Sequence, residues 1–86
     1  MIRSPPENVL KSIIGKYLVW SRITKYCHVD SIRGHDTQNK IVTADIDLLT
    51  VTETGIRQTV ECRYDVDDFG IYYVYAHNII KEDIQS

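Results

Sequence analysis

The sequence predicts a mainly β protein in which a short N-terminal helix precedes a strongly bent antiparallel sheet, or a small barrel, of four to five strands. Three observations lead to this prediction. Apolar residues recur at helical spacing near the N-terminus, later segments alternate apolar and polar residues, and polar turns separate those segments. The 86 residues are enough for a single domain, residues 1–86, with one modest core.

The helix is expected over about residues 5–15. Ser4 and Glu7 have the spacing of a capping box, and Pro5 stands at the first helical position, where it gives up no needed hydrogen bond. Gly15 is interpreted as the helix end. In between, spacings of three and four residues create an apolar face made of Val9, Leu10, Ile13, Ile14 and Tyr17.

Segments rich in β-branched and aromatic residues are predicted to be strands. They comprise residues 17–23, 26–32, 41–52, 56–66 and 71–80. A turn is expected near Thr24-Lys25, and a polar loop over residues 34–39. A sheet with one apolar face needs a cover, and one short helix covers so many strands only when the sheet bends on itself. Whether residues 56–66 form a sheet strand or an inserted hairpin arm stays open.

The residues do not form the pattern of a catalytic, cofactor or metal site. Cys27 and His28 are neighbours on a predicted strand, so their side chains point to opposite faces and do not form a nucleophile–base pair. Asp45 and Asp47 fall on the solvent face of a strand, and the histidines lack the spacing of metal ligands. We therefore expect a protein that is not an enzyme, with no catalytic residues, no cofactor and no metal ion.

Composition narrows the classes of partner. The net charge of -2 disfavours a strong electrostatic nucleic-acid binder. Cys27 and Cys62 fit neither a disulfide framework nor a zinc site, and such isolated cysteines are typical of reduced thiols in the cytoplasm or nucleus. The sequence shows no secretory signal and no apolar run long enough for a membrane span, so we expect no membrane association.

Tyrosines crowd the last predicted strand. Tyr72, Tyr73 and Tyr75 lie so close together that both faces of the strand carry a tyrosine. One face can belong to the core, and the other is then exposed or docked on a partner. Exposed tyrosine anchors protein interfaces and also stacks on RNA bases, while β propensity alone would explain the cluster equally well.

The N-terminal half of the chain resembles Sm and LSm proteins. Residues 10–19 (Leu-Lys-Ser-Ile-Ile-Gly-Lys-Tyr-Leu-Val) are similar to that family's opening helix and its Gly-Lys step into the first strand. Tyr26, Asp36 and Asn39, which precede an apolar strand, resemble the first Sm motif. His28 stands where that motif has a glycine.

The C-terminal part resembles the second Sm motif. Residues 74–80 (Val-Tyr-Ala-His-Asn-Ile-Ile) follow its order, but Tyr75 and Ala76 replace the arginine and glycine of the family. Of the family's uridine pocket, Asn39 carries over, whereas the arginine–glycine step does not.

The resemblance implies an Sm-like barrel that pairs edge to edge with another Sm-fold protein. Its last strand would span residues 79–84, after a turn at His77-Asn78. In this respect the chain is similar to Gemin-type Sm-fold subunits of the SMN complex, which are linked to small nuclear ribonucleoprotein assembly and RNA splicing in the cytoplasm and nucleus. The predicted partner interface consists of Tyr72, Tyr73, Val74, Tyr75, Ile79 and Ile80.

Two further functions stay open beside this one. The chain could be an LSm-type ring subunit that binds RNA directly, with Asn39, Tyr75 and Asn78 as candidate RNA contacts. It could also be a small viral or mobile-element inhibitor that binds a host protein through its acidic strand faces.

Overall fold

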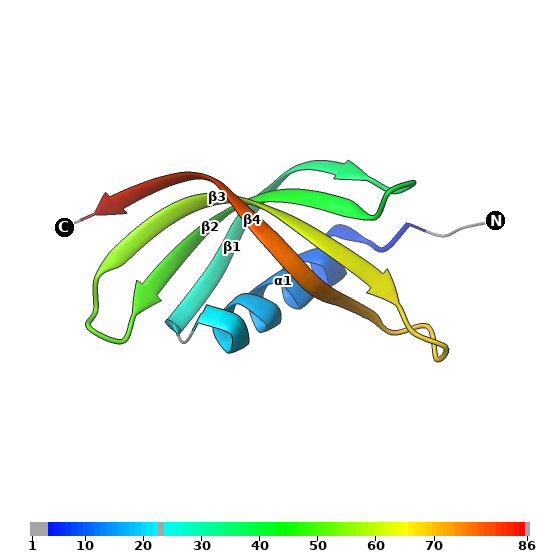
Figure 1. Ribbon diagram of the computed structural model, residues 1–86, viewed down its shortest axis with the longest axis horizontal. Coiled ribbons are helices and arrows are strands. Elements are labelled where there is room, and N and C mark those ends of the chain that lie inside the picture. Colours follow the sequence, from blue (N-terminus) through cyan, green and yellow to red (C-terminus); the bar gives the residue numbers. More distant parts are fainter. Residues whose placement is uncertain (1–3, 23, 86) are drawn as a thin grey trace.

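The computed structural model describes residues 4–22 and 24–85, which form one helix followed by four strands (Figure 1). Helix α1 spans Glu7–Arg22. The strands are β1 (Thr24–Asp36), β2 (Ile41–Thr50), β3 (Gly55–Val66) and β4 (Tyr72–Gln85). They lie in the order β1-β2-β3-β4, each antiparallel to its neighbours. The predicted fold class, a helix followed by a bent antiparallel sheet, is confirmed, and the sheet is open.

The sheet arches over the helix. In Figure 1 the strands bend across α1, which lies on their concave side. The helix contacts both β1 and β4, so it reaches from one edge strand to the other. Register shifts interrupt the β1–β2 and β3–β4 ladders, and bulges of this kind increase the bend and twist of a sheet.

The core lies between α1 and the concave face of the sheet. From β2 come the alternate residues Val42, Ala44, Ile46 and Leu48. From β3 come Val60, Cys62 and Tyr64. From α1 come Leu10, Ile14 and Leu18, one helical turn apart. Burial of each of these leucine and isoleucine side chains stabilises the fold by roughly 1.5–3 kcal/mol.

The helix is longer than the sequence predicted, and the strand predicted over residues 17–23 is wrong for residues 17–22, while residue 23 lies outside the described residues. Residues 17–22 continue α1 because Leu18 extends the buried stripe that Leu10 and Ile14 begin. Gly15 does not end the helix and lies inside it. The turn predicted at Thr24-Lys25 is also wrong, since β1 begins at Thr24.

β4 is one strand from Tyr72 to Gln85, so the predicted turn at His77-Asn78 and the separate strand over residues 79–84 are wrong. His77 pairs with Cys62 and Asn78 with Glu61, in an antiparallel ladder that continues on both sides of them. The open question about residues 56–66 is also answered. β3 is an interior strand between β2 and β4, not an inserted arm.

Substitution of Gly15 by alanine is expected to stabilise the protein by about 0.5–1 kcal/mol, because glycine inside a helix has a higher entropic cost than alanine. There is room for the methyl group, since a Cβ at this position would lie 3.9 Å from Val29 Cγ2, an ordinary contact distance. Urea unfolding measures the change.

The matched control is Gly70→Ala. Gly70 has a φ of 82°, a left-handed conformation that costs alanine roughly 1–2 kcal/mol. This variant should lose stability where the Gly15 variant gains it. A loss of stability in Gly15→Ala would contradict the assignment of Gly15 to the helix interior.

Candidate functional site

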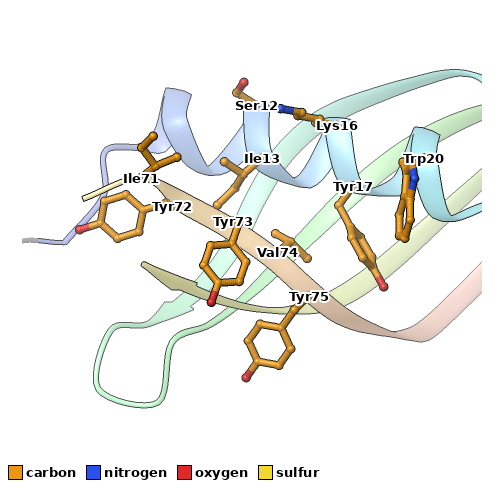
Figure 2. Close-up of a pocket in the computed structure, with 10 residues that line it drawn as sticks. All are labelled: Ser12, Ile13, Lys16, Tyr17, Trp20, Ile71, Tyr72, Tyr73, Val74 and Tyr75. Atoms are coloured by element: carbon orange, nitrogen blue, oxygen red, sulfur yellow. The ribbon is translucent and has the colours of Figure 1, made fainter. Parts of the chain in front are cut away.

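A groove of about 640 Å³ runs between α1 and the first part of β4 (Figure 2). We call it the α1–β4 groove. One wall is a flank of the helix, and the other is the start of the edge strand. The helix contributes Ser12, Ile13, Lys16, Tyr17 and Trp20, and the strand side contributes Ile71, Tyr72, Tyr73, Val74 and Tyr75.

Aromatic side chains of α1 stand beside the buried stripe of the helix. Tyr17 and Trp20 lie on one flank of α1, with ring centroids 6.4 Å apart. Trp20 is 79% exposed although it is the largest apolar side chain of the protein. An exposed tryptophan beside an apolar groove is typical of a protein interface, where this residue is enriched among the side chains that dominate binding energy.

The edge strand carries aromatic residues on both of its faces. Val74 is buried and Tyr72 half-buried on the side of the helix, whereas Tyr73 and Tyr75 are exposed. Figure 2 shows Val74 between α1 and β4, and the rings of Tyr73 and Tyr75 projecting from the other side of the strand. Tyr75 is an extra residue in the ladder, because Val74 pairs with Tyr64 and Ala76 with Arg63.

A contact between Tyr17 and His77 ties the helix to β4. The Tyr17 hydroxyl lies 3.2 Å from His77 Nδ1, and the two rings meet edge to face with centroids 5.4 Å apart. This contact fixes the position of α1 relative to the middle of β4, so that a ligand meets a preformed groove.

The outer edge of β4 carries fewer of the features that protect an edge strand than the outer edge of β1 does. β4 is the last strand of the sheet and pairs only with β3 among the described strands. On β1, the ammonium of Lys11 donates to the backbone carbonyl of Asp30 at 3.4 Å, and three register shifts break the ladder, against two on β4. Cationic side chains and bulges are devices that protect an edge strand from pairing.

The β3–β4 turn holds a further exposed aromatic residue at the end of the groove. The Asp67 carboxylate accepts hydrogen bonds from the backbone N–H groups of Phe69 and Ile71, both at 2.9 Å. Gly70 supplies the left-handed conformation that the turn needs. Phe69 is 90% exposed on this turn, and Ile71 continues the apolar surface into the groove.

The residues predicted as a partner interface lie together on β4. Tyr72, Tyr73, Val74 and Tyr75 line the α1–β4 groove, while Ile79 and Ile80 are exposed farther along the same strand.

The residues predicted as RNA contacts are dispersed. Asn39 lies in the β1–β2 turn, where its amide donates to Asp36 at 2.8 Å. Asn78 pairs with Glu61 in the ladder of β4. Tyr75 lines the groove, and the two asparagines do not.

The helix wall of the groove was not predicted from the sequence. Ile13 lies in the helix predicted over residues 5–15 and Trp20 in the strand predicted over residues 17–23, so the prediction puts the two on different elements, with Lys16 between them. The signal was present in the continued spacing of four residues from Leu10 to Leu18, which a reading of Gly15 as a stop ignores.

Ion pairs neutralise several cations on the convex face of the sheet, the face turned away from α1. Arg57 binds Asp47 at 2.9 Å and Asp30 at 2.9 Å, and Lys40 binds Asp65 at 2.7 Å. Arg63 and Lys81 on the same face form no ion pair with the described residues, so these two side chains are the free positive charge that this face offers a phosphate backbone.

Asp45 is a buried carboxylate of the convex face and has a structural role. Thr59 Oγ1 and Arg33 Nε each donate to it at 2.6 Å, and Ser31 lies at 3.4 Å. The hydrogen bond from Thr59, followed by that from Arg33, lowers the pKa of Asp45 below its usual value.

The cysteines do not form a reactive site. Cys62 is fully buried in the core, and burial raises its pKa to about 12, so its thiol stays protonated at neutral pH. Cys27 is half-buried and forms no disulfide with the described residues. Among the described residues, no group of three or more His, Cys, Asp or Glu side chains could hold a metal ion.

His35 predicts a pH dependence of stability. Its ring contacts the hydroxyl of Tyr64, and burial lowers the pKa of His35 below 6.5, although Asp36 opposes the shift. The unfolded chain therefore binds this proton more readily than the folded one. The contribution of neutral His35 is complete above pH 6.5 and is lost as the pH falls below that value.

We expect the free energy of unfolding to fall between pH 7.5 and 5.5, and His35→Gln to flatten this slope. Urea unfolding at a series of pH values measures it. The variant of an exposed histidine, His28→Gln, shows how much of the change comes from removing any histidine. If both variants flatten the slope equally, burial of His35 is not the cause.

Comparisons of the chain with models of protein families, with curated protein sequences and with solved structures found no match. None of the helices formed by residues 4–22 and 24–85 is long and apolar enough to cross a membrane. The evidence for the candidate site therefore comes from its geometry alone.

Proposed function

We propose that this chain is a non-catalytic protein-interaction subunit that pairs edge to edge, through β4, with a strand of a partner protein. One observation carries the proposal. The unpaired edge of β4 lies between aromatic side chains on both sides, Tyr17 and Trp20 from α1 on one and Tyr73 and Tyr75 on the other.

Strand addition fits the chemistry of this edge. An added strand satisfies the outward N–H and C=O groups of β4, and its side chains alternate between the two faces of the sheet. Those on the concave side enter the α1–β4 groove, and those on the convex side meet Tyr73. Main-chain pairing thus supplies affinity, and the aromatic residues supply anchors of the kind that dominate interfaces.

The sequence resemblance supports a particular class of partner, another Sm-like protein in small nuclear ribonucleoprotein assembly. Sm-like barrels associate by pairing the fourth strand of one subunit with the fifth of the next, so such a protein offers a free strand. The sequence motifs support an Sm-like partner, whereas the order of helix and strands does not. Residues 17–19 resemble the start of the first Sm strand but lie in α1.

The alternatives find less support. Direct RNA binding through a ring subunit needs free cations, and five of the described ones are each paired with a carboxylate: Lys11, Lys25, Arg33, Lys40 and Arg57. Lys16, Arg63 and Lys81, which form no ion pair with the described residues, lie on different elements. Inhibition through acidic strand faces is disfavoured for the same reason, since these ion pairs neutralise carboxylates of the convex face.

The double variant Tyr73→Asp/Tyr75→Asp is expected to weaken partner binding at least tenfold, because it places two charges on the exposed side of the paired edge. The measurement is light scattering coupled to size exclusion, with candidate Sm-like proteins added to the purified chain. Circular dichroism checks that the variant is folded.

The matched control is Tyr26→Asp on β1. Tyr26 is 54% exposed and Tyr75 is 55% exposed, so the two substitutions differ in location rather than in burial. Partner binding that survives in the double variant, or is lost equally in Tyr26→Asp, would overturn the assignment of the interface to β4. Binding of oligo-U that weakens as salt is added would favour the RNA-binding alternative.

A further inference from the structure

We propose that the contact between His35 and Tyr64 is a pH-sensitive switch that sets the position of Tyr72 on the strand wall of the α1–β4 groove. The inference goes beyond the proposed function, because it concerns the free chain and what controls the shape of its groove. The rings of these three residues contact one another in series, from β1 through β3 to β4.

This series of rings lies on the concave side of the sheet. His35 pairs with the buried residue Val42 in the β1–β2 ladder, so its side chain shares the concave face. The ring centroids of His35 and Tyr64 are 5.4 Å apart, and those of Tyr64 and Tyr72 are 6.1 Å apart in an edge-to-face contact. Tyr64 is 2% exposed, whereas Tyr72 lines the groove. One buried ring thus connects a half-buried histidine to the groove wall.

Protonation of His35 changes the hydrogen bond at the start of the series. The Nε2 atom of His35 and the hydroxyl of Tyr64 share a hydrogen bond. A neutral imidazole can accept a hydrogen at this nitrogen, whereas an imidazolium only donates. The hydroxyl hydrogen then needs another acceptor, and among the described residues His35 is the hydrogen-bond partner that this hydroxyl has. Leaving a buried hydroxyl unsatisfied is unfavourable, so protonation weakens the contact.

The environment of His35 also disfavours its charged form. Burial lowers the pKa of His35, and Asp36 opposes the shift. The imidazolium gains hydration when it moves away from Tyr64 toward solvent. Because core side chains are close-packed, the loss of one neighbour allows Tyr64 to shift, and the ring of Tyr72 that packs against it shifts as well.

The charged groups near this contact leave the switch to His35. The Asp36 carboxylate already accepts from two backbone N–H groups of the β1–β2 turn, both at 3.1 Å. Lys40 in that turn and Glu7 in the first turn of α1 are each held in an ion pair. Burial raises the pKa of Tyr64, so its hydroxyl stays protonated. His35 is therefore the group of this contact that changes charge near neutral pH.

The direction of the effect follows from the lowered pKa. At pH values above 6.5, His35 is neutral and the groove has the geometry described above. As the pH falls below that value, the protonated form accumulates and Tyr72 leaves its position. A strand that occupies the groove then binds less tightly, by no more than about tenfold per pH unit, the limit for one exchanged proton.

Proton NMR of the aromatic rings, recorded on the chain alone between pH 7.5 and 5.0, tests the switch. The ring signals of Tyr72 are expected to move with the same midpoint as those of His35. The signals of Tyr73, which projects from the other side of β4, should stay constant (Figure 2). Circular dichroism at each pH checks that the chain is folded. Tyr72 signals that stay constant while His35 titrates, or a His35 that does not titrate in this range, would overturn the proposal.

The variant Tyr64→Phe keeps the buried ring and removes the hydroxyl. In this variant His35 should still titrate, whereas the Tyr72 signals should no longer follow it. If they follow it unchanged, the field of the charged ring moves the Tyr72 signals and the hydrogen bond does not. The switch would then be overturned even though the pH dependence of the signals persists.

The matched control is His77→Gln, which removes the histidine at the opposite wall of the groove. His77 contacts Tyr17 of α1, with ring centroids 5.4 Å apart. The titration of Tyr72 should survive in this variant and disappear in His35→Gln. The reverse pattern would assign the pH dependence to His77 and contradict the switch at His35.

These experiments separate the failure of this inference from the failure of the proposed function. The NMR titration uses no partner, so a negative result leaves strand addition at β4 intact. A chain in which Tyr72 follows His35, but whose partner binding survives Tyr73→Asp/Tyr75→Asp, would keep the switch and overturn the proposed function alone.

Discussion

One helix covering a four-stranded open sheet is the constraint on which the rest of the molecule depends. The helix fills the concave side through Leu10, Ile14 and Leu18 and reaches both edge strands, but it cannot also satisfy the backbone groups that the edges present to solvent. On β1, Lys11 meets one edge carbonyl and three bulges break the ladder. On β4 the edge is lined by aromatic and aliphatic side chains instead, which favour contact with another chain over contact with water.

The strands of the fold could be predicted from the sequence because apolar and polar residues alternate along β2 and β3. Every second residue from Val42 to Leu48 is buried, and the polar residues between them face the convex side. The sequence predicts too short a helix because two signals overlap at Tyr17-Leu18-Val19-Trp20. The segment has the β-branched and aromatic composition of a strand, yet Leu18 also continues the spacing of four residues that Leu10 and Ile14 begin. Packing against the sheet decides between the two, and local propensity does not.

One wall of the candidate site could be predicted from the sequence, and the other could not. The tyrosines of β4 were visible as a cluster, because three of them occupy four consecutive positions. The opposite wall requires knowing that α1 continues to Arg22 and lies alongside β4, a contact between residues about sixty positions apart, such as Tyr17 and His77. Sequence spacing carries no direct information about such a contact. The turn once expected at His77-Asn78 also concealed that one strand carries both the aromatic and the aliphatic half of the edge.

The two halves of β4 differ in a way that the core of this chain does not require. Ile79, Ile80 and Ile84 are exposed, and the core would be unchanged if they were polar. Natural edge strands usually carry charge at such positions to prevent pairing, and here the charges are confined to Lys81, Glu82 and Asp83 between the isoleucines. An edge on which exposed apolar side chains outnumber charged ones has the composition of a surface that pairs with another strand, whereas a solvated edge would not need the exposed isoleucines.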